Sequence, residues 1–147
     1  MNVAIDLDGV LGDTRPLWNA WLEDAARRFH SIAELDPRAL PADRVAAARE
    51  LDRWAERGIG DWRASLARFA EDHAPVYLRP KARVNAALRR LEAAGARIAV
   101  FTDAPEELAR VALSHLGAAR RVQALTEHPD DDAVVIDNPD QLARLEI

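Results

Sequence analysis

The feature that most constrains the fold is the spacing of four short apolar runs, at residues 3–5, 98–101, 122–125 and 134–136. Short apolar runs bounded by polar and turn-forming residues are typical of strands in a buried parallel sheet. Two segments between these runs have helical start and stop signals. Residues 81–94 lie between Pro80 and Gly95, and residues 105–116 begin with Pro105 and end just before Gly117. This alternation predicts an α/β protein, a three-layer α/β sandwich with a parallel, Rossmann-like sheet.

The connection between the first two predicted strands is too long for a simple crossover. About 90 residues separate Ile5 from Ile98, whereas a crossover between parallel strands needs only a dozen or so. We therefore predict a core of residues 1–11 and 79–147 and an inserted helical cap subdomain of residues 12–78. Apolar residues recur at helical spacing in the insertion, and all four Trp lie there, as expected of a small subdomain that needs large side chains for its own core. The helical stripes are Trp18, Leu22, Ala25 and Phe29; Leu51 and Trp54; and Trp62, Leu66, Phe69 and His73.

Charge and composition exclude several classes of protein. The formal net charge is −5, with 20 basic and 25 acidic residues, which argues against binding to a nucleic-acid polymer. No apolar run is long enough to span a membrane, and the N-terminus does not resemble a signal peptide. The sequence has no cysteine, which excludes disulfides and thiolate sites. We expect a cytoplasmic protein, a monomer or homodimer, and a small phosphorylated substrate stays possible.

Short polar side chains follow three of the predicted strands. Asp6 and Asp8 follow the first, Thr102 and Asp103 the second, and Asp137 the last. Any one of them could be an ordinary turn residue or helix cap. Two acids so close together are harder to explain, because unit charges 4 Å apart repel by about 4 kcal/mol at an effective dielectric of 20. A set of oxygen ligands without His or Cys suits a hard cation, and Mg²⁺ shared with a phosphate is the natural candidate.

These residues resemble the motifs of a known family. Residues 6–11, 101–103 and 134–137 are similar, in this order, to the first, second and fourth motifs of the haloacid dehalogenase superfamily. The continuation through residues 12–14 resembles members that carry a helical cap after the first motif. Dehalogenases of the superfamily lack the second acid of the first motif. The presence of Asp8 therefore favours the phosphatase branch, with phosphoric monoester hydrolysis as the implied activity.

The resemblance also implies roles for single residues. Asp6 would be the nucleophile that forms an aspartyl-phosphate. Asp8 would act as acid and base, and the neighbouring negative charge would help it to hold a proton. Mg²⁺ would be held by the Asp6 carboxylate, the Asp8 backbone carbonyl and Asp137. The residues expected to bind the phosphoryl group are Thr102, Asp103 and Gly9, the last of which also allows a sharp turn.

The sequence departs from the family in its third motif, which usually supplies a Lys. No Lys follows Lys81, so we expect Arg120 or Arg121 to substitute, although this pair could equally be solvated after a helix. Two alternatives to a phosphatase stay open at this point. One is a catalytically weak or inactive binding protein with the same fold, and the other is a phosphomutase.

Overall fold

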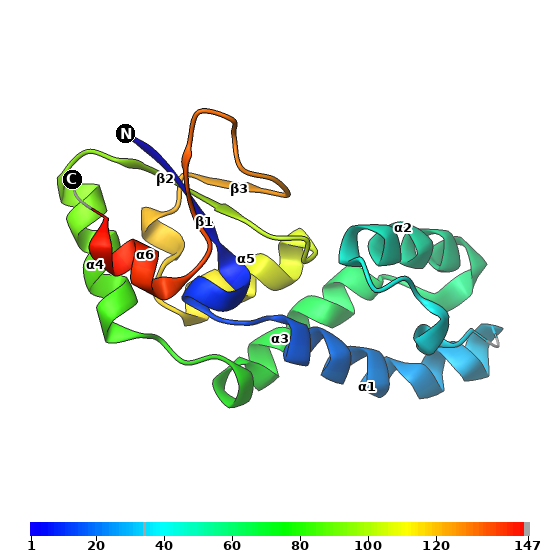
Figure 1. Ribbon diagram of the computed structural model, residues 1–147. Coiled ribbons are helices and arrows are strands. Elements are labelled where there is room, and N and C mark those ends of the chain that lie inside the picture. The colour runs from blue at the N-terminus through cyan, green and yellow to red at the C-terminus, as the bar shows by residue number, and fades with distance from the viewer. Residues whose placement is uncertain (34, 146–147) are drawn as a thin grey trace.

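The computed structural model describes residues 1–33 and 35–145. Its centre is a parallel sheet of four strands in the order β3-β2-β1-β4 (Figure 1). The strands are β1 (Asn2–Asp6), β2 (Arg97–Phe101), β3 (Ala124–Thr126) and β4 (Val134–Ile136). The predicted α/β class with a parallel, Rossmann-like sheet is confirmed. The third strand begins later than predicted, because Val122 caps a 3₁₀ turn, η4 (Ala119–Arg121).

Buried apolar residues of the strands form the centre of the core, and in β1 three consecutive residues, Val3, Ala4 and Ile5, are buried. Ile5 is fully buried and is paired in register with Val100 on one side and Ile136 on the other. Because parallel strands align their carboxyl ends, this register brings the residues that follow β1, β2 and β4 to one edge of the sheet.

Two of the helices that pack near the sheet were predicted from their boundary signals. They are α4 (Ala82–Ala93) and α5 (Glu106–His115), and Gly95 and Gly117 follow them with φ values of +79° and +76°. Asn85 on α4 donates a hydrogen bond to the carbonyl of Leu116 at 3.3 Å, which ties the two helices together. A short helix, α6 (Pro139–Arg144), follows β4, and the connection from β3 to β4 is a loop, residues 127–133.

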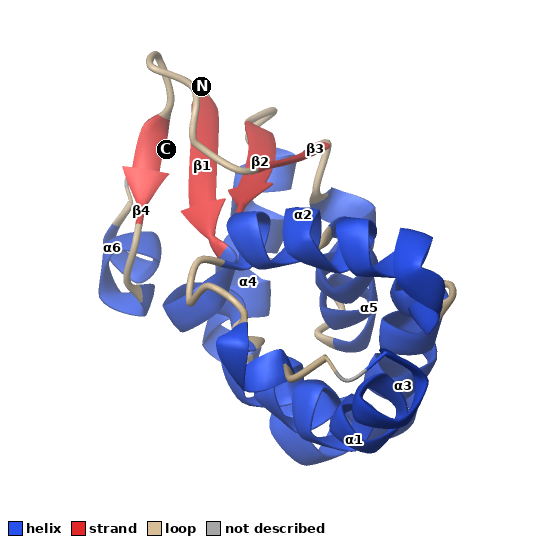
Figure 2. Ribbon diagram, turned by 90° about the vertical axis from the view of Figure 1, so that its right-hand side faces the viewer, coloured by secondary structure: helices blue, strands red, loops and turns tan. Residues whose placement is uncertain are grey.

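The long connection between β1 and β2 is helical, as predicted. It contains a π-turn, η1 (Leu7–Leu11), then α1 (Arg15–Ala33), η2 (Pro37–Ala39), α2 (Arg44–Trp54), η3 (Ala55–Ile59) and α3 (Trp62–Tyr77). In Figure 2 these helices lie beside and below the carboxyl edge of the sheet. Since α3 packs against α5, the core of this segment is continuous with that of the sheet. The boundaries of an inserted subdomain at residues 12 and 78 stay a proposal.

Aromatic side chains build the interior of this helical segment. Trp21 is fully buried, and its ring centroid lies 5.5 Å from Trp18, 6.0 Å from Trp62 and 6.1 Å from Phe29. Its indole N–H donates to the Ser65 hydroxyl at 3.2 Å, so that the polar atom of a buried Trp is satisfied. These residues therefore have a structural role, in agreement with the sequence analysis. No helix in residues 1–33 or 35–145 has the length and apolarity needed to cross a membrane.

Candidate active site

The residues that follow the strands gather at the carboxyl edge of the sheet, as predicted. Asp6 ends β1, Thr102 directly follows β2, and Asp137 directly follows β4. Since β1 lies between β2 and β4, Asp6 occupies the centre of this edge. The backbone N–H of Thr102 donates to the carbonyl of Thr126 at 3.0 Å, and its hydroxyl accepts from the N–H of Ala104 at 3.1 Å, which fixes the turn after β2.

A tight turn after β1 sets the direction of the two acids. The N–H of Asp8 donates to Oδ1 of Asp6 at 3.2 Å, and the N–H of Gly12 returns to the carbonyl of Leu7 at 3.1 Å. Gly9 lies within this turn with φ = +106°, a left-handed conformation that L side chains rarely adopt. A substitution at Gly9 would therefore strain the turn that carries Asp8.

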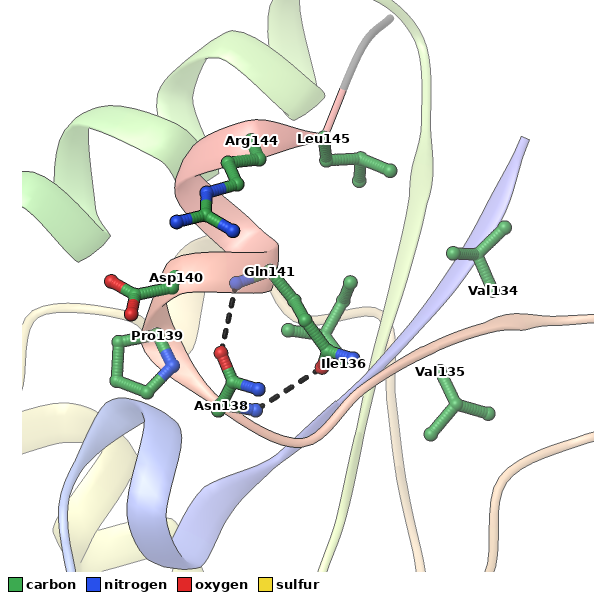
Figure 3. A pocket seen from close by; sticks show the side chains of 9 residues that line it. All are labelled: Val134, Val135, Ile136, Asn138, Pro139, Asp140, Gln141, Arg144 and Leu145. Atoms are coloured by element: carbon green, nitrogen blue, oxygen red, sulfur yellow. Dashed lines mark hydrogen bonds between the residues drawn. The ribbon is translucent and has the colours of Figure 1, made fainter.

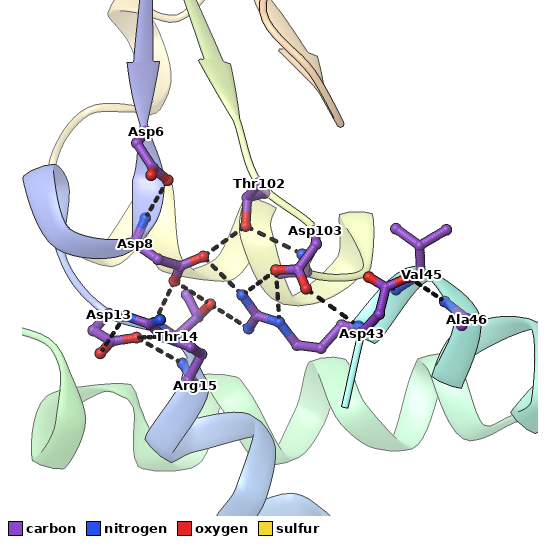
Figure 4. A network of polar contacts seen from close by, with 12 residues as sticks. Asp6, Asp8, Asp13, Thr14, Arg15, Asp43, Val45, Ala46, Thr102 and Asp103 are labelled. Carbon is purple, nitrogen blue, oxygen red and sulfur yellow. Dashed lines mark hydrogen bonds and ion pairs between the residues drawn. The ribbon is translucent and has the colours of Figure 1, made fainter. Parts of the chain in front are cut away.

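The Asp8 carboxylate accepts four hydrogen bonds (Figure 4). Its Oδ1 receives the backbone N–H and the hydroxyl of Thr14 at 2.8 and 2.7 Å. Its Oδ2 receives the Arg44 guanidinium at 2.7 Å and the Thr102 hydroxyl at 2.8 Å. Burial alone would raise the pKa of Asp8, but the bonds from Thr14, the charge of Arg44 and the bond from Thr102 together lower it. The expectation that Asp8 holds a proton because of its acidic neighbour is thus wrong for this arrangement.

Arg44 is the site residue that the sequence analysis missed. It opens α2, where Asp43 caps the helix by accepting from the N–H groups of Val45 and Ala46, and it is 2% exposed. Its Nη1 donates to the Thr14 hydroxyl and its Nη2 to Asp8, both at 2.7 Å. One guanidinium therefore joins the helical connection to the turn after β1.

Asp103 completes this network. Its Oδ1 accepts from Nε and Nη2 of Arg44 at 3.0 and 2.7 Å, and its Oδ2 accepts from the backbone N–H of the same residue at 3.2 Å. Both carboxylate oxygens are directed at Arg44, so the role that the contacts support for Asp103 is to orient this cation. The contacts do not support the predicted role in binding phosphate.

The structure does not bring Arg120 and Arg121 to this site. Both lie in η4, before β3 begins, and so at the amino edge of the sheet. The Nε of Arg121 lies 2.8 Å from a carboxylate oxygen of Glu92, near the end of α4. The prediction that Arg120 or Arg121 takes the place of the third-motif Lys is therefore wrong, because both lie at the opposite edge of the sheet from Asp6. The cations that reach the turn after β1 are Arg44 and Lys81, whose ammonium donates to the carbonyl of Val10 at 3.4 Å.

The Asp6 carboxylate accepts a single hydrogen bond, from the N–H of Asp8. Burial, then the charge of Asp8, raises its pKa; the bond from the Asp8 N–H and the charge of Arg15 act in the opposite direction, and Asp137 raises it further. Within residues 1–33 and 35–145, no three His, Asp or Glu side chains form a group able to hold a metal ion. The Asp8 carboxylate is turned toward Thr14, Arg44 and Thr102. The donors that stay available for a cation are oxygens: the carboxylates of Asp6 and Asp137 and the Asp8 carbonyl.

Asp137 lies two positions before α6, and Figure 3 shows the cap at the start of this helix. Asn138 caps this helix by accepting from the N–H of Gln141 at 2.9 Å, and the Gln141 side chain accepts from the N–H of Asp137 at 2.8 Å. A cavity of about 650 Å³ lies between β4 and α6, and neither Asp6 nor Asp8 lines it. The candidate site is therefore the edge around Asp6 and not this cavity.

Comparison with known proteins agrees with this fold. The profile of the haloacid dehalogenase-like hydrolases matches residues 1–145, and no curated protein matches the sequence. Among solved structures, the chain is similar to a phosphatase of this family from Thermococcus onnurineus, at 18% identity and a TM-score of 0.50. The match covers 86% of this chain and 62% of that one, so the chain spans less than two thirds of the length of that relative.

A second match is to a Thermotoga maritima protein assigned to the beta-phosphoglucomutases, at 18% identity and a TM-score of 0.46, over 88% of this chain and 63% of that one. At 18% identity the Thermococcus onnurineus structure bears on the fold alone, and the family assignment rests on the profile match over residues 1–145. By that match, the chain belongs to the haloacid dehalogenase-like hydrolase family.

Proposed function

We propose that the chain is a Mg²⁺-dependent phosphomonoesterase that acts through an aspartyl-phosphate on Asp6. The observation that carries this proposal is the contrast between two acids only two residues apart. Asp6 accepts one backbone hydrogen bond, whereas the Asp8 carboxylate is held by four. Two carboxyl groups in such different environments are suited to different tasks in one reaction. The sparsely bonded Asp6 is the one able to attack a phosphorus atom.

The metal is part of the proposal because the donors suit it. Asp6, Asp137 and the Asp8 carbonyl offer only oxygen, and the pKa of Asp6 is raised by burial and by the charges of Asp8 and Asp137, as expected where a cation would relieve repulsion. When bound, Mg²⁺ would neutralise charge on the phosphoryl oxygens and on the attacking carboxylate. Compensation for the missing third-motif Lys falls to Arg44, which Asp103 orients from 2.7 Å.

Three residues have roles in the two steps of the proposed reaction. In the first step, an Asp6 oxygen bonds to phosphorus as the bond to the leaving alcohol breaks, while the Thr102 hydroxyl donates to a phosphoryl oxygen. In the second step, Asp8, which is kept ionised by its lowered pKa, takes a proton from the water that attacks phosphorus, while the bond from phosphorus to Asp6 breaks and phosphate is released. This proton is the one that Asp8 gives to the leaving alkoxide in the first step of the next cycle. Each Asp8 oxygen already accepts two hydrogen bonds, so Asp8 must release one of these partners, such as Arg44, to carry the proton.

The saturation of Asp8 also favours a second candidate, a phosphate-binding protein of the same fold without turnover. All four partners of its carboxylate are within 2.8 Å, and Arg44 is buried. If Arg44 never releases Asp8, alkyl phosphates would bind but would not be hydrolysed.

Removal of the metal tests the proposal. Hydrolysis of 4-nitrophenyl phosphate is expected to be lost in EDTA and restored by Mg²⁺, because the repulsion among Asp6, Asp8 and phosphate is then no longer compensated. The release of 4-nitrophenol measures this directly. Full activity after exhaustive chelation would contradict the proposed metal, and binding of phosphate without any turnover would favour the second candidate.

A further inference from the structure

A cleft of about 1290 Å³ runs beside α1, between this helix and residues 35–44. In Figure 1 residues 35–44 run back beside α1 to the start of α2. The residues of α1 that line the cleft follow helical spacing over four turns, so they form one stripe along the helix. They are Arg15, Trp18, Asn19, Leu22, Glu23, Ala26, Arg27 and His30.

One end of the cleft lies beside the candidate active site. Arg15, Arg44 and Asp103 line this end. Arg44 is bonded to Asp8 at 2.7 Å, and the charge of Arg15 acts on the carboxylate of Asp6. Both walls of the cleft, α1 and residues 35–44, therefore lead to the acids that would react with a phosphate.

The middle of the cleft is mainly apolar, with Asn19 and Glu23 as its polar residues on α1. Trp18, Leu22 and Ala26 line it from α1, and Leu35 and Leu40 line it from the other wall. Trp18 and Ala26 are eight positions apart (26 − 18), which corresponds to about 12 Å along a helix. Polar side chains return beyond this stretch, with Arg27, His30 and Arg38 among them.

We infer that this cleft binds the alcohol part of an elongated, apolar phosphomonoester, such as an alkyl phosphate, and not a sugar phosphate. The inference rests on the proposed function, which places the phosphate at Asp6. The polar side chains of this stretch, Asn19 and Glu23, are on α1, whereas Leu40, Pro41 and Ala42 of the other wall offer no side-chain hydrogen bonds. A sugar would bring hydroxyl groups against that wall, and burying unpaired hydroxyls is unfavourable. An alkyl chain of matching length would instead bury apolar surface on Leu22, Leu35 and Leu40, which are only partly buried in the free chain.

Binding of n-alkyl phosphates to the full chain carrying Asp6→Asn, in Mg²⁺, tests the inference by calorimetry without turnover. From ethyl to octyl phosphate, below the micellar concentration, we expect the affinity to rise by about two- to fourfold per methylene. Glucose 6-phosphate is expected to bind no more tightly than ethyl phosphate. Equal affinities for ethyl and octyl phosphate, or tighter binding of the sugar phosphate, would overturn the inference.

A matched pair of variants locates the effect. Leu22→Asn is expected to lower the ratio of octyl to ethyl affinity by about tenfold, because it puts an amide in the apolar stretch. Ile32→Asn is the control, since Ile32 lies on the same helix, is 54% exposed and does not line the cleft. It should keep the ratio found in the parent chain, and an equal loss of the ratio in both variants would contradict the assignment to the cleft.

Hydrolysis by the unmodified chain separates the two claims. If ethyl phosphate and octyl phosphate are hydrolysed with the same kcat/KM and bind equally, the proposed function stands and the inference fails. If no ester is hydrolysed but affinity rises with chain length, the cleft is a binding site for apolar phosphomonoesters and the proposed catalysis fails.

Discussion

The Asp6→Asn variant is expected to lose phosphomonoesterase activity by at least about 1000-fold, because an amide cannot form the aspartyl-phosphate. The fold should be retained. Burial and the charges of Asp8 and Asp137 raise the pKa of Asp6, so its ionised form is disfavoured in the folded chain. The neutral amide should therefore leave the thermal midpoint unchanged or raise it. Rates with 4-nitrophenyl phosphate and thermal unfolding by circular dichroism measure the two effects.

The pH dependence of this stability difference has a definite sign. A group whose pKa is raised on folding stabilises the folded chain fully below its unfolded pKa, about 3.9 for Asp, and loses this contribution as the pH rises through the folded value. In metal-free buffer, any gain in stability of Asp6→Asn over the parent chain should be present at neutral pH and vanish in acid. Asp24→Asn is the matched control for activity, since the side chains of Asp24 and of its ion-pair partner Arg28 are 53% and 48% exposed and neither lines the cleft. Turnover by Asp6→Asn within tenfold of the parent chain would exclude Asp6 as the nucleophile.

The Arg44→Met variant is expected to destabilise the chain by about 3–5 kcal/mol, the usual effect of removing one partner of a buried ion pair. The side chains of Arg44 and Asp8 are only 3% and 9% exposed, so the Asp8 carboxylate would stay buried without its cation. Asp103 is 42% exposed and can be solvated by water, so Asp8 should account for most of the loss. Urea unfolding measures the change in the free energy of unfolding.

Two further variants show whether this loss comes from the buried charge. Arg38→Met removes an arginine that is 91% exposed and paired with Asp36 at 3.0 Å, and it should cost less than about 1 kcal/mol. Adding Asp8→Asn to Arg44→Met should recover part of the loss, because the orphaned charge is then gone. The account of the network fails if Arg44→Met is no more destabilising than Arg38→Met.

The sheet and the helices around it could be predicted because their signals are local. A strand such as residues 134–136 is an apolar run, and the helices before and after β2 begin after Pro80 and at Pro105 and end near Gly95 and Gly117. The edge that carries Asp6, Thr102 and Asp137 then follows from parallel topology alone. The reading of residues 12–78 as helical also succeeded, because its apolar residues repeat at helical spacing.

Arg44 could not be predicted, because its partners are remote in sequence. It lies 36 positions from Asp8 and 59 from Asp103, and nothing in its neighbours marks it as buried. The only available signal was indirect: two acids at strand ends require a cation, and the usual Lys is missing. Arg120 and Arg121 were chosen to fill this gap because they fall between the second and fourth motifs. The structure shows that this interval includes the amino edge of the sheet, where a cation cannot reach Asp6.

The most direct test of the account is to trap the covalent intermediate. The chain is mixed with ³²P-labelled phenyl phosphate and Mg²⁺, quenched in acid within the first turnover, and digested for peptide mapping. We predict a hydroxylamine-labile label on the peptide that contains Asp6, and no label on Asp6→Asn. Turnover without any labelled protein, or a label on a peptide other than that of Asp6, would contradict the account.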